Sequence, residues 1–272
     1  MAQVPIPSPA HCLLERLNAI AAELARRDDA LALLALGSVG RETERIDAWS
    51  DLDFFVLVRE GAKLRYLDRF DWLADARPLA WSYRNTVDGH KALMEDGVYC
   101  EFAVFEVHEL AGIPYSPGRF HWRRDEVDPA LAEPRRAPPG PSGEDWLIGE
   151  ALSNLLIGLR REARGEHLAA MRLIQVHALD CLLELREQRV AAESGVPRDP
   201  FNVDRRVEQR QRGVAESLPA LAAGYAHNAS SALAILAALE CLADVAPRLA
   251  TEIRALALSA SGSGGVGRGN RR

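Results

Sequence analysis

The chain has little cysteine, no long apolar run and no excess of positive charge. Its four cysteines lie far apart, without CxxC spacing, which argues against a zinc site and suits a reducing compartment. Its 33 lysines and arginines are outnumbered by 39 aspartates and glutamates, which argues against a general nucleic-acid binder. The longest apolar stretch, residues 231–239, is too short to span a bilayer. The N-terminus lacks the pattern of a signal peptide, so we expect a cytoplasmic protein with no membrane or nucleic-acid partner.

The first part of the chain alternates segments typical of helices with segments typical of strands. Apolar spacing predicts helices over residues 8–27, with Ser8 as the cap, and over residues 61–76. Short runs of apolar and β-branched residues predict strands at residues 31–36, 51–58, 79–83, 91–94 and 99–107. The last two strands flank a turn and form a hairpin. We therefore predict an α+β domain in which a small mixed sheet carries helices on one face.

The second part of the chain is helical in pattern. Residues 134–143, PRRAPPGPSG, have the composition of a linker. Beyond them, long amphipathic segments with short connections predict a helical bundle whose first helix is capped by Ser142. The predicted organisation is a domain at 1–133, a linker at 134–143, a helical domain at 144–258 and a disordered tail at 259–272.

Residues 31–58, LALLALGSVGRETERIDAWSDLDFFVLV, hold the most informative pattern in the chain. An apolar run ends in Gly37-Ser38, and a second one begins with Asp51 and Asp53, two residues apart. Glycine lets a backbone approach a ligand closely, and turn amides and a serine hydroxyl can donate to a phosphate. The two aspartates point to the same face of a strand, where they repel each other unless a cation lies between them. Mg²⁺ is the usual cation beside a phosphate site.

The runs GSVGRE and WSDLDF resemble the signature of the DNA polymerase β-like nucleotidyltransferase superfamily, which is a Gly-Ser turn followed by Asp-x-Asp on the next strand. The wider resemblance is to the small aminoglycoside and lincosamide nucleotidyltransferases. It covers roughly the first half of the chain, and later includes the run DPFNVDRRVEQR. The resemblance implies that residues 1–133 are the catalytic domain and that the helical domain binds the acceptor. It also implies ATP or another nucleoside triphosphate as co-substrate, with one or two Mg²⁺ ions held by Asp51 and Asp53.

The superfamily usually adds a third carboxylate from a later strand, and Glu101 is our candidate. It sits in the middle of the strand VYCEFAVFEV, where an unpaired acid would be costly. Glu106 lies near the end of this strand, where solvent is expected, and we interpret it as structural. By resemblance, Glu101 is either the general base or a third metal ligand. Geometry must decide between these roles.

Two cationic residues are predicted to bind nucleotide phosphates. Arg41 directly follows the glycine-serine turn and offers a guanidinium fork suited to phosphate oxygens. Lys91 precedes the candidate strand and is interpreted either as a triphosphate ligand or as an exposed edge-strand lysine. We expect His90 at the surface and Trp49 packed beside the site.

In the helical part, a second long helix is predicted to run to about Val190. Its polar residues, such as Gln175, are interpreted either as a solvated face or as contacts for an acceptor. Arg205 and Arg206 start a predicted helix after a loop. They either contact nucleotide phosphates or pair with the nearby acids Asp204 and Glu208.

The predicted function is Mg²⁺-dependent transfer of a nucleoside monophosphate, AMP from ATP, to a hydroxyl of a small molecule. The acceptor classes suggested by the resemblance are aminoglycosides and lincosamides, which would make the protein an antibiotic-resistance enzyme. An alternative is a nucleotidyltransferase of a toxin–antitoxin or signalling system that modifies a protein or RNA partner. Ribonucleases in such systems carry an Arg–His spacing that Arg172–His177 and Arg161–His167 share. A non-catalytic nucleotide-binding protein is a third interpretation, and both monomer and homodimer are open.

Overall fold

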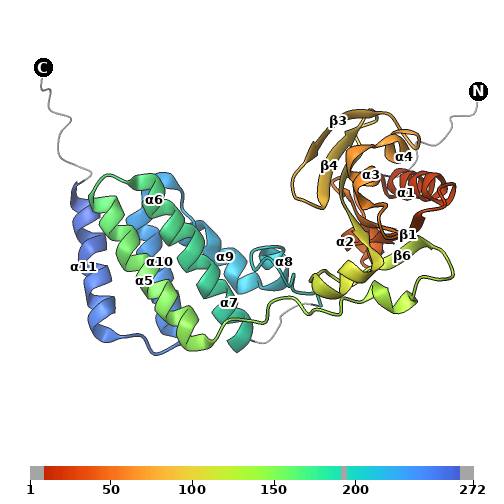
Figure 1. Cartoon of the computed structure of the whole chain (residues 1–272). Coiled ribbons are helices and arrows are strands. Elements are labelled where there is room, and N and C mark those ends of the chain that lie inside the picture. Colours follow the sequence, from red (N-terminus) through yellow and green to blue (C-terminus); the bar gives the residue numbers. More distant parts are fainter. Residues whose placement is uncertain (1–8, 191–194, 264–272) are drawn as a thin grey trace, which may run out of the picture. The chain divides into compact units, whose positions relative to one another are not determined.

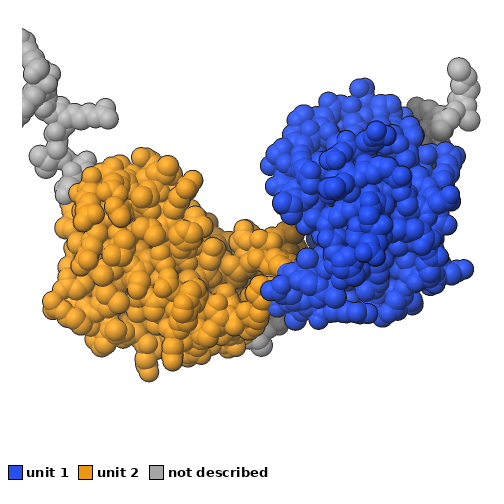
Figure 2. Space-filling view, in the orientation of Figure 1, with its two compact units in different colours: residues 1–138 blue, residues 139–272 orange. Residues whose placement is uncertain are grey.

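The computed structural model describes residues 9–190 and 195–263 (Figure 1). The chain divides into two compact units, residues 1–138 and residues 139–272 (Figure 2). The division falls inside the proline-rich segment 134–143 that the sequence marks as a linker. Each unit has its own hydrophobic core, so each is described by itself.

In its described part, unit 1 is built around a six-stranded sheet with the order β3-β4-β5-β2-β1-β6. Strands β2 and β5 pair in parallel and the other neighbours pair antiparallel, so the predicted mixed α+β sheet is confirmed. The strands are β1 (Ala30–Ala35), β2 (Leu52–Val58), β3 (Leu79–Arg84), β4 (Gly89–Met94), β5 (Tyr99–Glu106) and β6 (Arg119–Arg123). The helices are α1 (Pro9–Ala25), α2 (Gly37–Gly40), α3 (Lys63–Asp68) and α4 (Asp71–Ala74), and single 3₁₀ turns lie at Thr43–Arg45, Val107–Gly112 and Pro129–Ala132.

One face of the sheet is covered by α1, α3 and α4. Every second residue of the central strands points into this core, and Phe54 of β2 stacks on Phe102 of β5 with ring centroids 5.4 Å apart. Trp72 of α4 meets both rings edge to face. The alternation that buries Phe54 and Phe102 turns Asp53 and Glu101 to the opposite face.

The opposite face is covered at one end only. A second cluster, with Leu57 and Phe105 at its centre, lies under the 3₁₀ turns at 107–112 and 129–132. At the other end of this face, Asp53, Tyr99, Glu101 and Lys91 are half-buried rather than buried. The sheet therefore presents a polar strip at the start of β2 and β5, beside a packed apolar patch.

Unit 1 differs from the prediction at several places. The predicted helix at 61–76 is two short helices, because the backbone at Arg69 is extended and ends α3. Strand β6 was not predicted, although the apolar Phe120 and Trp122 alternate with polar residues in RFHWR, as in a half-buried strand. His90 is buried, 4% exposed, with its ring against Phe70 and Phe102. Ser8, the predicted helix cap, lies outside the described residues.

Unit 2 is a bundle of helices. Its elements are α5 (Glu144–Ala163), α6 (His167–Met171), a π-helical segment (Arg172–Ala178), α7 (Leu179–Arg189), α8 (Val207–Arg210), α9 (Arg212–Leu221), a 3₁₀ turn (Tyr225–His227), α10 (Asn228–Leu242) and α11 (Pro247–Ser263). One core, built mostly of leucine, isoleucine and alanine, joins α5, α7, α10 and α11. The predicted bundle is present in this part of the chain.

Several details of the bundle differ from the prediction. Gly143, not Ser142, is the residue before α5, and no side chain caps that helix. The second long helix contains a π-helical segment in the middle. The helix that Arg205 and Arg206 are predicted to start begins after them, at Val207, and α9 follows at residues 212–221. Helix α11 continues through Ser263, so the predicted disordered tail does not begin at residue 259. None of the described helices combines the length and apolarity that a membrane span needs.

Candidate active site

The residues predicted to carry chemistry meet on the open face of the sheet. In the parallel pairing of β2 and β5, Asp53 lies directly opposite Glu101. In the antiparallel pairing of β4 and β5, Lys91 lies directly opposite Glu101. Residues paired in this way share a face and stand about 5 Å apart. The register therefore places Asp53, Glu101 and Lys91 in one row across three strands.

Lys91 and Glu101 form an ion pair within this row. The Nζ atom of Lys91 donates to Oε1 of Glu101 over 2.7 Å, and both side chains keep about a third of their surface exposed. The hydrogen bond to Glu101 raises the pKa of Lys91, and the carboxylate charge acts in the same direction. Tyr99 lies beside the pair, and its pKa is raised first by burial and then by the carboxylates of Glu101 and Asp51. Tyr99 was not among the predicted site residues, although its place in β5 two residues before Glu101 was a usable signal.

The glycine-serine turn meets Asp53 at close range. Gly37 has a positive φ of 52°, and a Cβ atom placed on it would lie 3.2 Å from Oδ2 of Asp53. The amide of Leu36 donates to the carbonyl of Asp53 over 2.8 Å, which fixes the turn to the start of β2. A Cβ on Gly40 would lie 2.7 Å from the carbonyl oxygen of Ala35. Glycine is therefore required at both ends of this turn, by conformation at Gly37 and by space at Gly40.

The side chain of Arg41 contacts neighbouring parts of unit 1 in the described structure. Its Nε donates to the carbonyl of Gly118 over 2.8 Å, and its guanidinium pairs with Glu133 at 2.5 Å. From the neighbouring strand, Arg119 donates through Nε to the carbonyl of Gly40 over 2.9 Å and also reaches the carbonyl of Val39. These two arginines tie the glycine-serine turn to the segment around β6. Sequence analysis missed Arg119 because it missed the strand that carries it, and a nucleotide contact by Arg41 stays a prediction.

The carboxylates of Asp51 and Asp53 suit a metal ion that is bound jointly by the protein and by a substrate phosphate. Asp51 directly precedes β2, and both Asp51 and Asp53 lie near enough to Cys100 to contribute, after burial, to raising the pKa of that thiol to about 12. Among the described residues, no group of three or more His, Cys, Asp or Glu side chains is arranged to hold a metal alone. Mg²⁺ commonly binds through one or two carboxylates together with substrate phosphates. Asp53, which lies against Gly37 of the glycine-serine turn, and Asp51, two residues before it, fit that shared arrangement, whereas Glu101 is engaged by Lys91.

Trp49 does not pack beside this site as predicted. Its side chain is 91% exposed, and its backbone amide donates to Oδ1 of Asp47 in the turn before β2. Glu106, interpreted as structural, accepts a hydrogen bond from the amide of Gly61 over 2.7 Å. Glu109 closes a reciprocal cap with Glu106 at the end of β5.

In unit 2, Arg205 and Arg206 both lie against Asp199. Nη1 of Arg205 is 3.1 Å from Oδ2 of Asp199, and the guanidinium of Arg206 is 3.9 Å from the same atom. Burial opposes ionisation of Asp199, but amide donors from Phe201 and Asn202 and the charge of Arg205 outweigh it and lower its pKa. The pairing of both arginines with Asp199 shows that residues of the run DPFNVDRRVEQR contact one another and stabilise the local structure. It was not among the partners considered from the sequence.

The polar residues of the second long helix have several different partners. Gln175 is buried and bonds Asn228 and the backbone of Gly224, so it is not on a solvated face. His167 pairs with Glu162 at 2.8 Å and Arg161 pairs with Glu166 at 2.8 Å. Arg172 and His177, the other pair with ribonuclease-like spacing, are both exposed on the π-helical segment.

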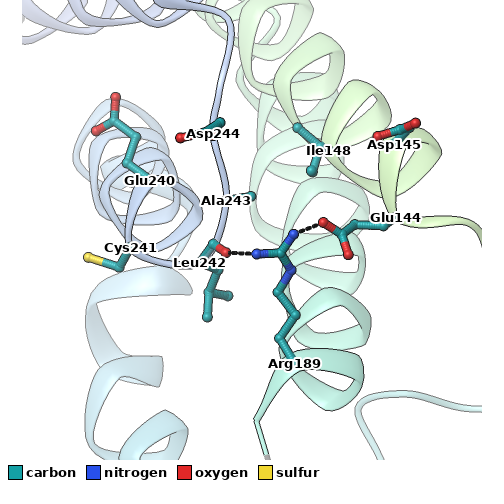
Figure 3. Close-up of a pocket in the computed structure, with 9 residues that line it drawn as sticks. All are labelled: Glu144, Asp145, Ile148, Arg189, Glu240, Cys241, Leu242, Ala243 and Asp244. Atoms are coloured by element: carbon teal, nitrogen blue, oxygen red, sulfur yellow. Dashed lines mark hydrogen bonds and ion pairs between the residues drawn. The ribbon is translucent and has the colours of Figure 1, made fainter.

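A pocket of about 420 Å³ lies within unit 2 (Figure 3). It is lined by the start of α5, the end of α7 and the connection from α10 to α11. Arg189 reaches across it, pairing with Glu144 and donating to the carbonyl of Leu242. Glu240, Asp145 and Asp244 make its wall acidic. None of the residues predicted for catalysis or nucleotide binding lines it.

Comparison with known proteins gives a loose structural likeness and nothing by sequence. No family model matches the chain, and no curated protein matches it. Among solved structures, the chain is similar to a crystal structure of an aminoglycoside 6-adenyltransferase from Bacillus subtilis, with 14% sequence identity and a TM-score of 0.37. The match covers 94% of this chain and 99% of the other. The function proposed below depends on the residues of this chain.

Proposed function

We propose that the protein is a nucleotidyltransferase that moves a nucleoside monophosphate, AMP from ATP, to a hydroxyl of a small molecule. One observation carries the proposal. The carboxylate of Asp53 lies against Gly37 of the glycine-serine turn on one side and opposite Glu101 on the other. A phosphate-sized turn, a metal-binding acid and a candidate base thus follow one another along a single row. Phosphoryl transfer depends chiefly on this kind of positioning and on electrostatic stabilisation.

Each residue of the row then has a defined task. The amides of Gly37 and Ser38 and the Ser38 hydroxyl donate to the triphosphate, and Asp51 and Asp53 would hold Mg²⁺. When bound, Mg²⁺ supplies neutralisation of the charge that develops on the phosphates. Glu101 accepts the proton of the acceptor hydroxyl. The acceptor oxygen then bonds to the α-phosphorus, the bond from that phosphorus to the bridging oxygen breaks, and pyrophosphate leaves.

Two roles for Lys91 fit this scheme, and kinetic experiments distinguish them. It orients Glu101 through the ion pair that it forms with that carboxylate. Alternatively, its ammonium turns to the triphosphate when nucleotide is bound. The first role affects turnover, whereas the second affects the apparent affinity for ATP.

For the acceptor, we propose an aminoglycoside or a lincosamide. Both classes carry several hydroxyl groups on linked or substituted rings, and the net charge of −6 favours encounter with their ammonium groups. The helical unit 2 is proposed to contribute to acceptor choice. Antibiotic resistance would follow if modification blocks the drug.

The test is release of pyrophosphate from ATP with Mg²⁺, measured in parallel with aminoglycosides, with lincosamides and without acceptor. We expect release that depends on one acceptor class, with a mass gain of one nucleoside monophosphate on that acceptor. The Asp53→Ala variant should lose at least about 10³-fold in rate while its circular dichroism spectrum stays unchanged. Asp47→Ala, in the turn before β2, is the matched control and should keep its activity.

Two results would contradict the proposal. Transfer that persists in Asp53→Ala would exclude Asp53 as a metal ligand. A wild-type protein that releases no pyrophosphate with any small acceptor would remove the antibiotic assignment. Protein and RNA acceptors would then be assayed in the same way.

A further inference from the structure

Two aromatic side chains stand exposed on the edge strand β3, on the same face of the sheet as the candidate active site. Trp81 is 48% exposed and Tyr83 is 50% exposed. Their ring centroids are 5.7 Å apart and their planes are tilted by 34°. Exposed tryptophan and tyrosine side by side are uncommon on a surface that binds nothing, since aromatic rings contribute large apolar areas.

The strand register connects this pair to the catalytic row. Tyr83 lies opposite Lys91 in the pairing of β3 with β4, and Lys91 lies opposite Glu101. Trp81 lies opposite Leu93, which in turn lies opposite Tyr99. The aromatic pair therefore continues the same face by two strands beyond β5. At about 4.8 Å between strands, Tyr83 is roughly 10 Å from Glu101 and roughly 14 Å from Asp53.

The order of groups along the row determines which substrate reaches the aromatic pair. The glycine-serine turn, proposed to hold the triphosphate, is beside Asp53 on the β1 side. Glu101, proposed to take the proton of the acceptor, is on the other side of Asp53, towards β4 and β3. An acceptor whose hydroxyl is at Glu101 extends away from the triphosphate over β4 and β3. The nucleotide lies in the opposite direction.

We propose that Trp81 and Tyr83 form a stacking surface for a ring of the acceptor that lies beyond the reacting hydroxyl. This inference rests on the proposed function and adds the location and chemistry of an acceptor subsite. The subsite takes an uncharged hydroxylated ring, whose apolar C–H face stacks on the aromatic planes. The acceptor has more than one ring or a ring with a long substituent, because it spans from Glu101 to β3.

One charge beside the aromatic pair supports an uncharged ring. The ammonium of Lys91 is close enough to Tyr83 for the two to interact. Arg84 does not contribute, because it is the next residue on the strand and faces the other side of the sheet, where it pairs with Asp68. The ammonium of Lys91 disfavours a second ammonium group on the part of the bound ring beside it, although an aromatic face alone would attract one. Between the aromatic pair and β5, the face is polar at Lys91 and apolar at Leu93, as a hydroxylated ring system requires.

Kinetics with single variants test the subsite. Trp81→Ala and Tyr83→Ala should each raise the KM for the acceptor by about tenfold, with the KM for ATP unchanged. Tyr83→Phe should behave as wild type, because it keeps the aromatic face and removes only the hydroxyl. The matched control is Leu64→Ala, which removes an exposed apolar side chain from α3 on the helix-covered side of unit 1. It should leave both KM values unchanged.

Failure of this inference is distinguishable from failure of the proposed function. If wild type transfers nucleotide and the Trp81 and Tyr83 variants keep the acceptor KM, the subsite is wrong and the function stands. A rise in the KM for ATP instead would place the nucleobase on the aromatic pair and overturn the inference. A change in sedimentation coefficient for Trp81→Ala would make β3 a self-association edge and would also overturn it.

Direct binding is measured independently of catalysis by saturation-transfer NMR with the same aminoglycosides and lincosamides. In Asp53→Ala, transfer of the nucleotide is lost but saturation of acceptor ring protons should persist. In the double variant Trp81→Ala/Tyr83→Ala, ring-proton saturation should fall at least severalfold. The inference is overturned if no compound shows ring-proton saturation that the double variant removes.

Discussion

Lys91 of β4 holds Glu101 of β5 through a hydrogen bond of 2.7 Å between Nζ and Oε1. The two residues lie directly opposite each other in the antiparallel pairing. Both side chains are partly exposed, and exposed ion pairs contribute little to stability because solvent screens them. The pair therefore matters more for the orientation of the Glu101 carboxylate than for the stability of the fold. Asp53 lies on the other side of Glu101, opposite it in the pairing of β2 with β5.

The first prediction concerns this ion pair. Lys91→Met should lower kcat by about tenfold, because Glu101 loses the partner that orients it towards the acceptor hydroxyl. Lys91→Arg should restore part of the activity, since a guanidinium can still reach the carboxylate. The melting temperature should stay close to that of wild type in both variants. If Lys91 instead binds the triphosphate, Lys91→Met raises the KM for ATP with little change in kcat. Unchanged kinetics would contradict both roles.

The second prediction concerns the glycine at the start of the turn. Gly37→Ala should cost about 1 kcal/mol of stability because alanine is strained at positive φ. It should also lower kcat/KM by about 100-fold, since the new Cβ would lie 3.2 Å from Oδ2 of Asp53 and would displace that carboxylate. Chemical denaturation and steady-state kinetics measure the two effects separately.

Gly61→Ala is the matched control for this experiment. Gly61 also has a positive φ, of 79°, but a Cβ there would meet nothing within 4 Å. Its replacement should give a similar loss of stability and no loss of activity. Equal activities in the two variants would show that the contact between Gly37 and Asp53 has no catalytic importance.

The sequence allowed the strands and the row of acids to be predicted for different reasons. Runs of apolar, β-branched and aromatic residues identified β2 and β5, and the spacing of Asp51 and Asp53 identified the polar face. The parallel pairing that sets Asp53 beside Glu101 is long-range, so no local pattern contained it. Arg119 escaped notice because its strand, of only 5 residues, was not predicted, although Phe120 and Trp122 alternate there with polar residues. His90, by contrast, was predictable, since it shares strand periodicity with the buried Ala92 and Met94.

The third prediction concerns pH dependence and His90. Burial, followed by the charge of Arg84, lowers the pKa of His90 below its usual value of 6.5. The unfolded chain therefore binds a proton near pH 6.5, whereas the folded chain does so only at lower pH. Between these values the unfolded state binds more protons, so the free energy of unfolding falls as pH falls below 6.5. Urea denaturation at a series of pH values from 7.5 to about 5 measures the slope.

His90→Phe should make this slope shallower. Phenylalanine fits between Phe70 and Phe102, and it removes a buried Nδ1 atom that has no hydrogen-bond partner in the described structure. His121 has a pKa lowered by burial too, so His121→Gln should remove a further part of the slope. If the double variant His90→Phe/His121→Gln keeps the full wild-type dependence of the free energy of unfolding on pH, other groups control the acid sensitivity.

The fourth prediction concerns the buried ion pair of Arg210 with Glu187 in unit 2. Arg210 is almost fully buried, and a second nitrogen of its guanidinium donates to the carbonyl of Val203 over 2.7 Å. Gln211 also donates to Glu187, over 2.6 Å. Removing Arg210 leaves the Glu187 carboxylate with a weaker cationic neighbour, Arg198, 3.9 Å away. Arg210→Met should therefore lower the free energy of unfolding by about 3 kcal/mol, as measured by urea denaturation.

Two further variants separate charge from packing at this pair. Arg254→Met breaks the pair with Glu240, which is far more exposed, and should cost at most about 1 kcal/mol. The double variant Arg210→Met/Glu187→Leu should regain part of the loss, because it removes the poorly compensated carboxylate and keeps most of the buried volume. If the double variant is less stable than Arg210→Met, the packing of the Glu187 side chain and its bond to Gln211 matter more than its charge. If Arg210→Met lowers the free energy of unfolding no more than Arg254→Met does, burial does not increase the contribution of the Arg210–Glu187 pair to the stability of unit 2.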